Sequence, residues 1–153
     1  MKLNALASLG VVALLAVVGV NQANAKPPSD RFEKETSPAV AQSKAVMQSG
    51  SFRAGEHPTR GRFSVVTKGG KRYLVLNSAF KTQEGPDVFV ILHRSAAPPI
   101  NGIRRRDYVS LGRLQSFSGT QSYRIPANVN LENYDSVVIW CRKFNANFGY
   151  ARL

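Results

Sequence analysis

The chain has 153 residues and one cysteine, with 21 Lys and Arg against 9 Asp and Glu, a formal net charge of +12. This length predicts at most one modest domain, and one cysteine excludes both an internal disulfide and a four-cysteine iron–sulfur cluster. The scarcity of acids argues against paired-carboxylate catalysis. Because Gly-x-Ser-x-Gly, P-loop and His-Glu-x-x-His motifs are also missing, the sequence favours a module over a stand-alone enzyme.

Residues 1–25 have the pattern of a secretory signal peptide. Lys2 precedes an apolar run from Leu3 to Val20, and Ala23-Asn24-Ala25 presents small residues at a signal peptidase site. The alternative is a retained membrane anchor, although the run lies at the short limit for a spanning helix. We expect cleavage, export to the periplasm or the extracellular space, and no transmembrane anchor afterwards.

Residues 26–49 are predicted to be a flexible linker. They are rich in proline, serine and mixed charge and poor in large apolar groups, so they bury too little surface to offset the entropy of ordering. A helical turn around residues 40–47 is the one local structure that we expect there. The domain proper is then residues 50–153.

The domain reads as all-β, with short strands between turns. Two β-rich runs flank Gly69-Gly70, which predicts a hairpin. A third run is apolar on both alternating faces, as expected for a central strand covered on both sides. The pattern predicts a small antiparallel β-sandwich or barrel, with strands at residues 62–66, 72–76, 88–93, 108–115, 122–125, 135–141 and 147–152.

Three features lie between or within these later strands. Ser95–Asp107 is predicted to be a long exposed loop. Gly112 interrupts its strand and is expected to mark a bulge. Asn130 is placed to cap one helical turn that ends at Tyr134.

The domain is strongly basic, with 16 Lys and Arg against 6 Asp and Glu, a net charge of +10. The one cluster is Arg104-Arg105-Arg106, which is either a solvated loop or an anion-binding site. An anionic lipid, an acidic polymer or an acidic protein would fit such a field. We expect no nucleic acid partner, because zinc-finger, helix-turn-helix and RNA-recognition patterns are missing.

Cys141 is the most distinctive residue. Strand alternation places it on one face with Val137 and Ile139, which favours a packed core thiol. An intermolecular crosslink, a reactive thiol and a ligand for a metal or haem iron are the other options. Arg142 and Lys143 follow it and would favour the thiolate.

Candidate partners for Cys141 are few. His57 lies in a turn and is either a cap for local backbone or a base or co-ligand for the thiol, and His93 and Asp87 read more readily as structural. A blue-copper set could in principle be drawn from His57, His93, Cys141 and Met47, but no ligand follows the cysteine. Covalent haem lacks its Cys-x-x-Cys-His motif, whereas non-covalent haem stays open and the metal is unknown.

Several short segments, in order, resemble the electron-transfer DM-thirteen domain family. They span most of residues 50–150 and include His57-Pro58-Thr59-Arg60-Gly61, Phe80-Lys81-Thr82, Gly85-Pro86-Asp87, Leu111-Gly112-Arg113-Leu114 and Val138-Ile139-Trp140-Cys141-Arg142-Lys143. The resemblance implies an extracellular or periplasmic β domain, associated in some proteins with DOMON or cytochrome-type modules. It also implies a redox role centred on the cysteine that matches Cys141, as a bare thiol or as a ligand to a prosthetic group.

Two functional hypotheses follow. The first is an exported redox or electron-transfer module that uses Cys141, assisted by His57, with a redox protein as its partner. The second is a non-catalytic binding module for an anionic cell-surface component, in which Arg104, Arg105 and Arg106 bind the anion.

Overall fold

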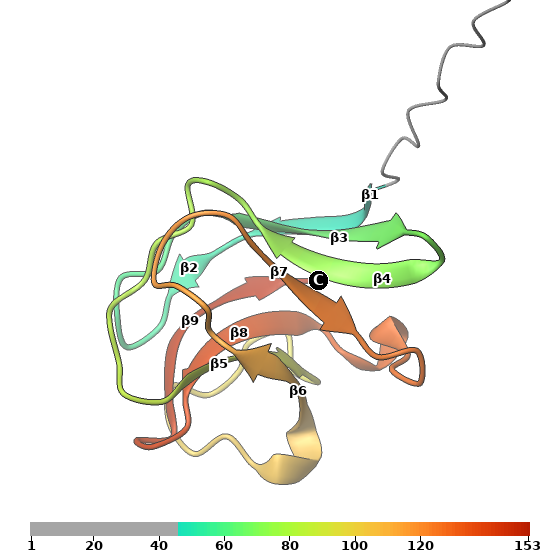
Figure 1. Ribbon diagram of the computed structural model, residues 1–153. Coiled ribbons are helices and arrows are strands. Elements are labelled where there is room, and N and C mark those ends of the chain that lie inside the picture. The colour runs from blue at the N-terminus through green and yellow to red at the C-terminus, as the bar shows by residue number, and fades with distance from the viewer. Residues whose placement is uncertain (1–45) are drawn as a thin grey trace, which may run out of the picture. The chain divides into compact units, whose positions relative to one another are not determined.

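The computed structural model describes residues 46–153, which form a sandwich of two antiparallel β-sheets (Figure 1). The four-stranded sheet has the order β1-β3-β4-β7, with bounds Val46–Ser51, Arg62–Lys68, Lys71–Leu76 and Gln121–Ile125. The five-stranded sheet has the order β2-β9-β8-β5-β6, with bounds Arg53–Ala54, Ala146–Arg152, Ser136–Cys141, Val88–His93 and Tyr108–Arg113. Neither sheet closes on itself, so the predicted all-β fold is confirmed as a sandwich rather than a barrel.

Local turn chemistry explains how the strands are joined. Gly69 and Gly70 both adopt positive φ, at 56° and 69°, and connect β3 to β4. Such angles are required in a tight hairpin turn and cost glycine little. Gly112, with φ at 140°, lies opposite the register shift between Val90 and Ile91 of β5. The predicted hairpin and bulge are therefore both confirmed.

Two 3-10 helices, η1 at Arg105–Asp107 and η2 at Leu131–Asn133, complete the secondary structure of the described residues. Asn130 caps η2, because its side chain accepts a hydrogen bond from the Glu132 N–H. This confirms the predicted helical turn.

The main core lies between the two sheets. Its largest fully buried side chains come from both layers and include Phe63, Leu74 and Leu76 from the four-stranded sheet and Val90 and Ile139 from the other. Because alternate residues of a strand point to opposite faces, each strand contributes one face to this core. The burial of these side chains is the principal stabilising contribution to the fold.

A second, smaller cluster covers the outer face of the five-stranded sheet. Ile91, Val138 and Trp140 pack there against Ile103. Most residues of the predicted loop at Ser95–Asp107 are exposed as expected, but Ile103 is buried and holds the loop against the sheet, which corrects the prediction at this point. The β5 strand is covered on both faces, as its apolar pattern predicts.

The N-terminal strand begins earlier than expected. β1 starts at Val46 and pairs with β3, so the predicted boundary at Gly50 falls inside a strand. The predicted helical turn at residues 40–47 ends in this strand, and its first residues lie outside the described part of the chain. The predicted signal peptide and most of the predicted linker also lie outside it.

Candidate redox site at Cys141

Cys141 is the last residue of β8 and lies in the core between the sheets. It pairs with Val88 of β5 on one side and Ala146 of β9 on the other, and its side chain is 0% exposed. Val137 and Ile139 share this inner core with Cys141, whereas Val138 and Trp140 belong to the outer cluster. The alternation predicted from the sequence is confirmed. Within the described residues the Cys141 sulfur makes no hydrogen bond.

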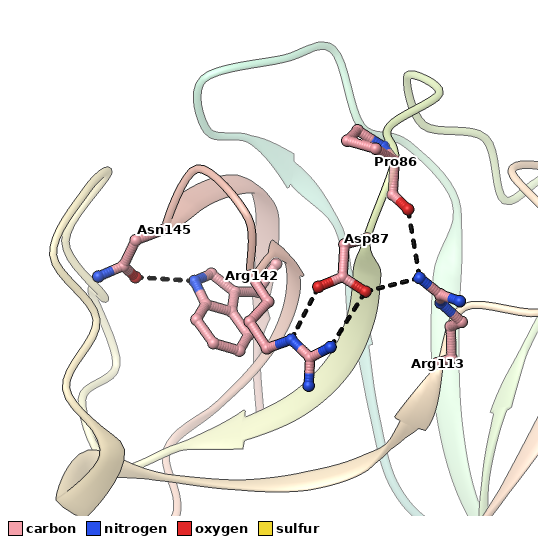
Figure 2. A network of polar contacts seen from close by, with 6 residues as sticks. Pro86, Asp87, Arg113, Arg142 and Asn145 are labelled. Carbon is pink, nitrogen blue, oxygen red and sulfur yellow. Dashed lines mark hydrogen bonds and ion pairs between the residues drawn. The ribbon is translucent and has the colours of Figure 1, made fainter.

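An ion-pair network, here called the Asp87 clamp, ties the end of β8 to its neighbours (Figure 2). One carboxylate oxygen of Asp87 accepts a hydrogen bond from Arg113 at 2.6 Å, and the other accepts one from Arg142 Nε at 2.7 Å. The Arg142 N–H also donates to the Asp87 carbonyl at 2.9 Å. The hydrogen bond from Arg142 is the main reason that the pKa of Asp87 lies below its usual range.

The clamp gives Arg142 a different role from the one expected. Its guanidinium pairs with Asp87 and lies 4.6 Å above the Phe89 ring, on the outer side of the sheet. Lys143 extends toward the exposed ring of Phe144. The two cations thus have other partners and do not contact the inward-facing thiol. The sequence predicts a structural role for Asp87 without its partners, because Arg113 and Arg142 are distant from it in sequence.

The turn after Cys141 is short and exposed. It runs from Arg142 to Asn145, and Asn145 adopts a positive φ of 50°. The Asn145 side chain accepts a hydrogen bond from the Trp140 indole N–H at 3.0 Å (Figure 2). Asn145 therefore has a structural role, since it links the turn to the outer cluster.

His57 lies near the core cluster but is not joined to Cys141. Its half-buried ring meets the Phe148 ring edge to face, with centroids 4.3 Å apart, and Phe148 belongs to the core that contains Cys141. Thr59 anchors this segment, because its hydroxyl donates to the Phe148 carbonyl at 3.0 Å. Among residues 46–153 no hydrogen bond connects the imidazole with the Cys141 thiol.

The arginine triplet lies elsewhere, at and just before η1 beside the end of β5. Arg105 stacks over Tyr108 at 5.1 Å and donates to the Tyr108 carbonyl at 3.2 Å. Arg106 lies 3.9 Å from the Asp107 carboxylate. His93, at the end of β5, is 4% exposed. The structure therefore separates the triplet from Cys141 and brings Arg104 to a cavity beside His93.

The described residues around Cys141 do not suit a metal or a haem. Within residues 46–153 no three His, Cys, Asp or Glu side chains gather as a metal site. Met47, from the hypothetical copper set, is exposed on β1 and its sulfur accepts a hydrogen bond from Thr67. Cys141 lines none of the four cavities described for this part of the chain. Its packed sulfur leaves no room for a haem.

These features define a small β-sandwich module with one thiol at a strand end. The chain belongs to the Electron transfer DM13 family, whose pattern it matches over residues 51–153. This confirms the family resemblance seen in the sequence and places the domain in an electron-transfer class. No curated protein and no solved structure shows significant similarity to the chain. Among residues 46–153 no helix has the length and apolar character to cross a membrane.

Proposed function

We propose that the chain is an exported redox module in which Cys141 is the side chain that is oxidised and reduced. The observation that carries this proposal is the position of the thiol: it is packed in the core, yet it is the last residue of β8 and adjoins an exposed turn. Membership of an electron-transfer family supports the redox class. Export rests on the signal-peptide pattern of residues 1–25.

The thiol would be reached by local opening of the hairpin tip. The Cys141–Ala146 pair is the last pair before the turn, so separating it exposes the sulfur while the rest of the β8–β9 ladder stays intact. Hairpin ends open at lower free energy than the core of a sheet. The Asp87 clamp opposes this opening, because it fixes Arg142, the residue that follows Cys141.

The chemistry that suits one bare thiol is a reversible two-electron oxidation by a peroxide. The thiolate attacks one peroxide oxygen, an S–O bond forms and the O–O bond breaks. The leaving oxygen takes up a proton, which gives an alcohol or water and a sulfenic acid on Cys141. No second cysteine is present to form an internal disulfide, so two thiols of a partner or of glutathione type would restore Cys141, releasing water and their own disulfide.

The test is oxidation of the folded full-length chain by a peroxide. A dione reagent selective for sulfenic acid should label Cys141, and added thiol should reverse the oxidation. Met47 is exposed and also gains oxygen, so a mass increase alone is insufficient and a Cys141→Ala variant serves as the blank. A chain that is labelled only after complete unfolding would show that Cys141 is an inert core residue.

The second candidate function is binding to an anionic cell-surface component or to an acidic redox protein. The observation that favours it is uncompensated charge: within residues 46–153 only Arg106, Arg113 and Arg142 form salt bridges. Vesicles with and without anionic lipid provide the measurement. Binding should require anionic lipid and weaken as salt is added, whereas salt-independent binding would contradict this function.

A further inference from the structure

A cavity at the end of β5 forms a second polar site, independent of Cys141 and of the redox proposal. It has a volume of about 490 Å³, and the polar residues that line it include His93, Ser95, Asn101, Arg104 and Asp107. His93 shares the outer face of the sheet with Ile91, so this cavity is separated from the inter-sheet core.

The histidine has one ring nitrogen engaged and one free. His93 Nδ1 accepts a hydrogen bond from the Ser95 backbone N–H at 3.0 Å. A neutral imidazole that accepts at Nδ1 carries its proton on Nε2. Within residues 46–153 the Nε2–H has no hydrogen-bond partner, although the side chain is 4% exposed. Within residues 46–153 the buried side-chain atoms without a partner are Gln48 Oε1 and Asn147 Oδ1, so the His93 Nε2–H keeps some solvent exposure and is open to a ligand from the cavity.

The arginines near the cavity differ in their contacts. Arg105 is engaged by Tyr108 and Arg106 lies beside Asp107. The Arg94 guanidinium donates only to the carbonyls of Arg106 and Asn133, so its charge is not neutralised. The Arg104 side chain makes no hydrogen bond or salt bridge with other described residues, and Arg104 lines the cavity.

The local charge favours an anion. From Arg94 to Asp107 the chain has four arginines and one aspartate, a net charge of +3. Phosphate carries several acceptor oxygens, which suits an imidazole N–H and a guanidinium that approach from different residues. We propose that this cavity binds a phosphate group, with His93 Nε2–H as donor and Arg104 as the principal cation.

The proposal predicts coupling between binding and protonation of His93. The charged or titratable groups nearest its ring come from several elements: Arg94 and Arg104 from the loop, Asp107 from η1, Tyr108 from β6 and Asp135 before β8. Burial lowers the pKa of His93, and the Asp107 charge opposes that shift. A bound phosphate would favour the imidazolium and raise this pKa, so phosphate should bind more tightly as the pH falls.

The test uses the fact that the chain has only two histidines. Their imidazole signals are titrated by NMR with and without inorganic phosphate, at ionic strength matched with chloride. Phosphate should raise the pKa of His93, and the His57 signal should show no comparable response to phosphate. Arg104→Ala should weaken phosphate binding roughly tenfold or more, as expected for a charge-assisted hydrogen bond. The matched Arg105→Ala should retain binding, and the His57 signal reports that each variant is folded.

The source of the phosphate is distinguished by a parallel titration with glycerol phosphate. A His93 response to both ligands identifies the phosphate group itself as the recognised element, and a response to the ester alone identifies a phosphate within a larger molecule. A response to neither, equal shifts of both histidines, or equal losses in Arg104→Ala and Arg105→Ala would overturn the proposal in favour of a diffuse basic surface.

Discussion

Arg142 donates a hydrogen bond from its side chain to Asp87 at 2.7 Å, while its neighbour Cys141 points into the core between the sheets. The backbone N–H of Arg142 also binds the Asp87 carbonyl. This one residue therefore fixes the end of β8 to the start of β5 immediately beside the thiol. Access to Cys141 should depend on how firmly that connection holds.

We expect Asp87→Asn to increase the rate at which a thiol reagent modifies Cys141, severalfold at neutral pH. An amide cannot replace the charge that pairs with both Arg113 and Arg142, so the hairpin tip should open more often. Rates are measured by mass spectrometry under native conditions. Asp135→Asn is the matched control, since Asp135 is exposed and forms no salt bridge within residues 46–153. Equal rates in the two variants would disprove the role of the clamp.

Acid should weaken the Asp87 clamp as Asp87→Asn does, because it protonates the Asp87 carboxylate. The pKa of Asp87 is depressed below its ordinary value of 3.8, so the clamp contributes stability above that pH and loses it as the pH falls through the depressed pKa. The free energy of unfolding should therefore decline in this range more steeply for the wild type than for Asp87→Asn. Urea unfolding at a series of acidic pH values provides the comparison, and parallel curves would argue against the prediction.

Cys141→Ser should destabilise the fold by about 1–3 kcal/mol, because it places a hydroxyl where the sulfur has no hydrogen-bond partner. Cys141→Ala should cost roughly 1 kcal/mol, the typical penalty for a small cavity. Chemical denaturation measures both. If the serine variant proved as stable as the wild type, the thiol site would have to contain water rather than packed apolar groups.

His93 should make stability depend on pH near neutrality. Its pKa is lowered by burial from an ordinary value of 6.5, so the unfolded chain takes up a proton first as the pH falls. The stability that this difference in pKa contributes to the folded chain is fully present above pH 6.5. It declines below pH 6.5 and is lost as the pH passes through the lowered pKa of His93. Urea unfolding between pH 8 and 5 should show this decline in the wild type and in His57→Gln. If stability still declined with falling pH in His93→Gln, the pH dependence would belong to another group.

Gly149→Ala should destabilise the protein by roughly 1–3 kcal/mol, the usual cost of overpacking. A Cβ on Gly149 would overlap the Thr59 side chain and lie 2.7 Å from the Arg53 carbonyl oxygen. Both neighbours belong to the segment that docks His57 against β9. Thermal unfolding measures the loss of stability. An unchanged melting temperature would mean that Gly149 and Thr59 are not closely packed.

The sequence predicts those features that depend on neighbouring residues. The Gly69-Gly70 hairpin, the Gly112 bulge and the inward face of Cys141 all follow from local turn chemistry or from the two-residue period of a strand. The Asp87 clamp could not be predicted in this way, because its arginines are brought together only by the pairing of β5 with β6 and β8. Ile103 was missed for a related reason: an isolated apolar residue in a polar loop gives no periodic signal.

The site was predictable only in part. The sequence indicates Cys141 as a candidate site because it is a lone cysteine at a strand end. The burial of Cys141, the Asp87 clamp and the separation of His57 from the thiol are tertiary properties. The same holds for His93 and Arg104, which are eleven positions apart in the sequence and come together only because the loop between them folds back onto the sheet.

The most direct test of the redox proposal is the rate of Cys141 labelling in the native wild type as a function of urea concentration. If the thiol is reached by opening of the hairpin tip, the rate at low urea should be nearly independent of urea, because such an opening exposes little surface. A rate that instead rises from zero urea with the full dependence of global unfolding would contradict the account and leave Cys141 as a packed core residue.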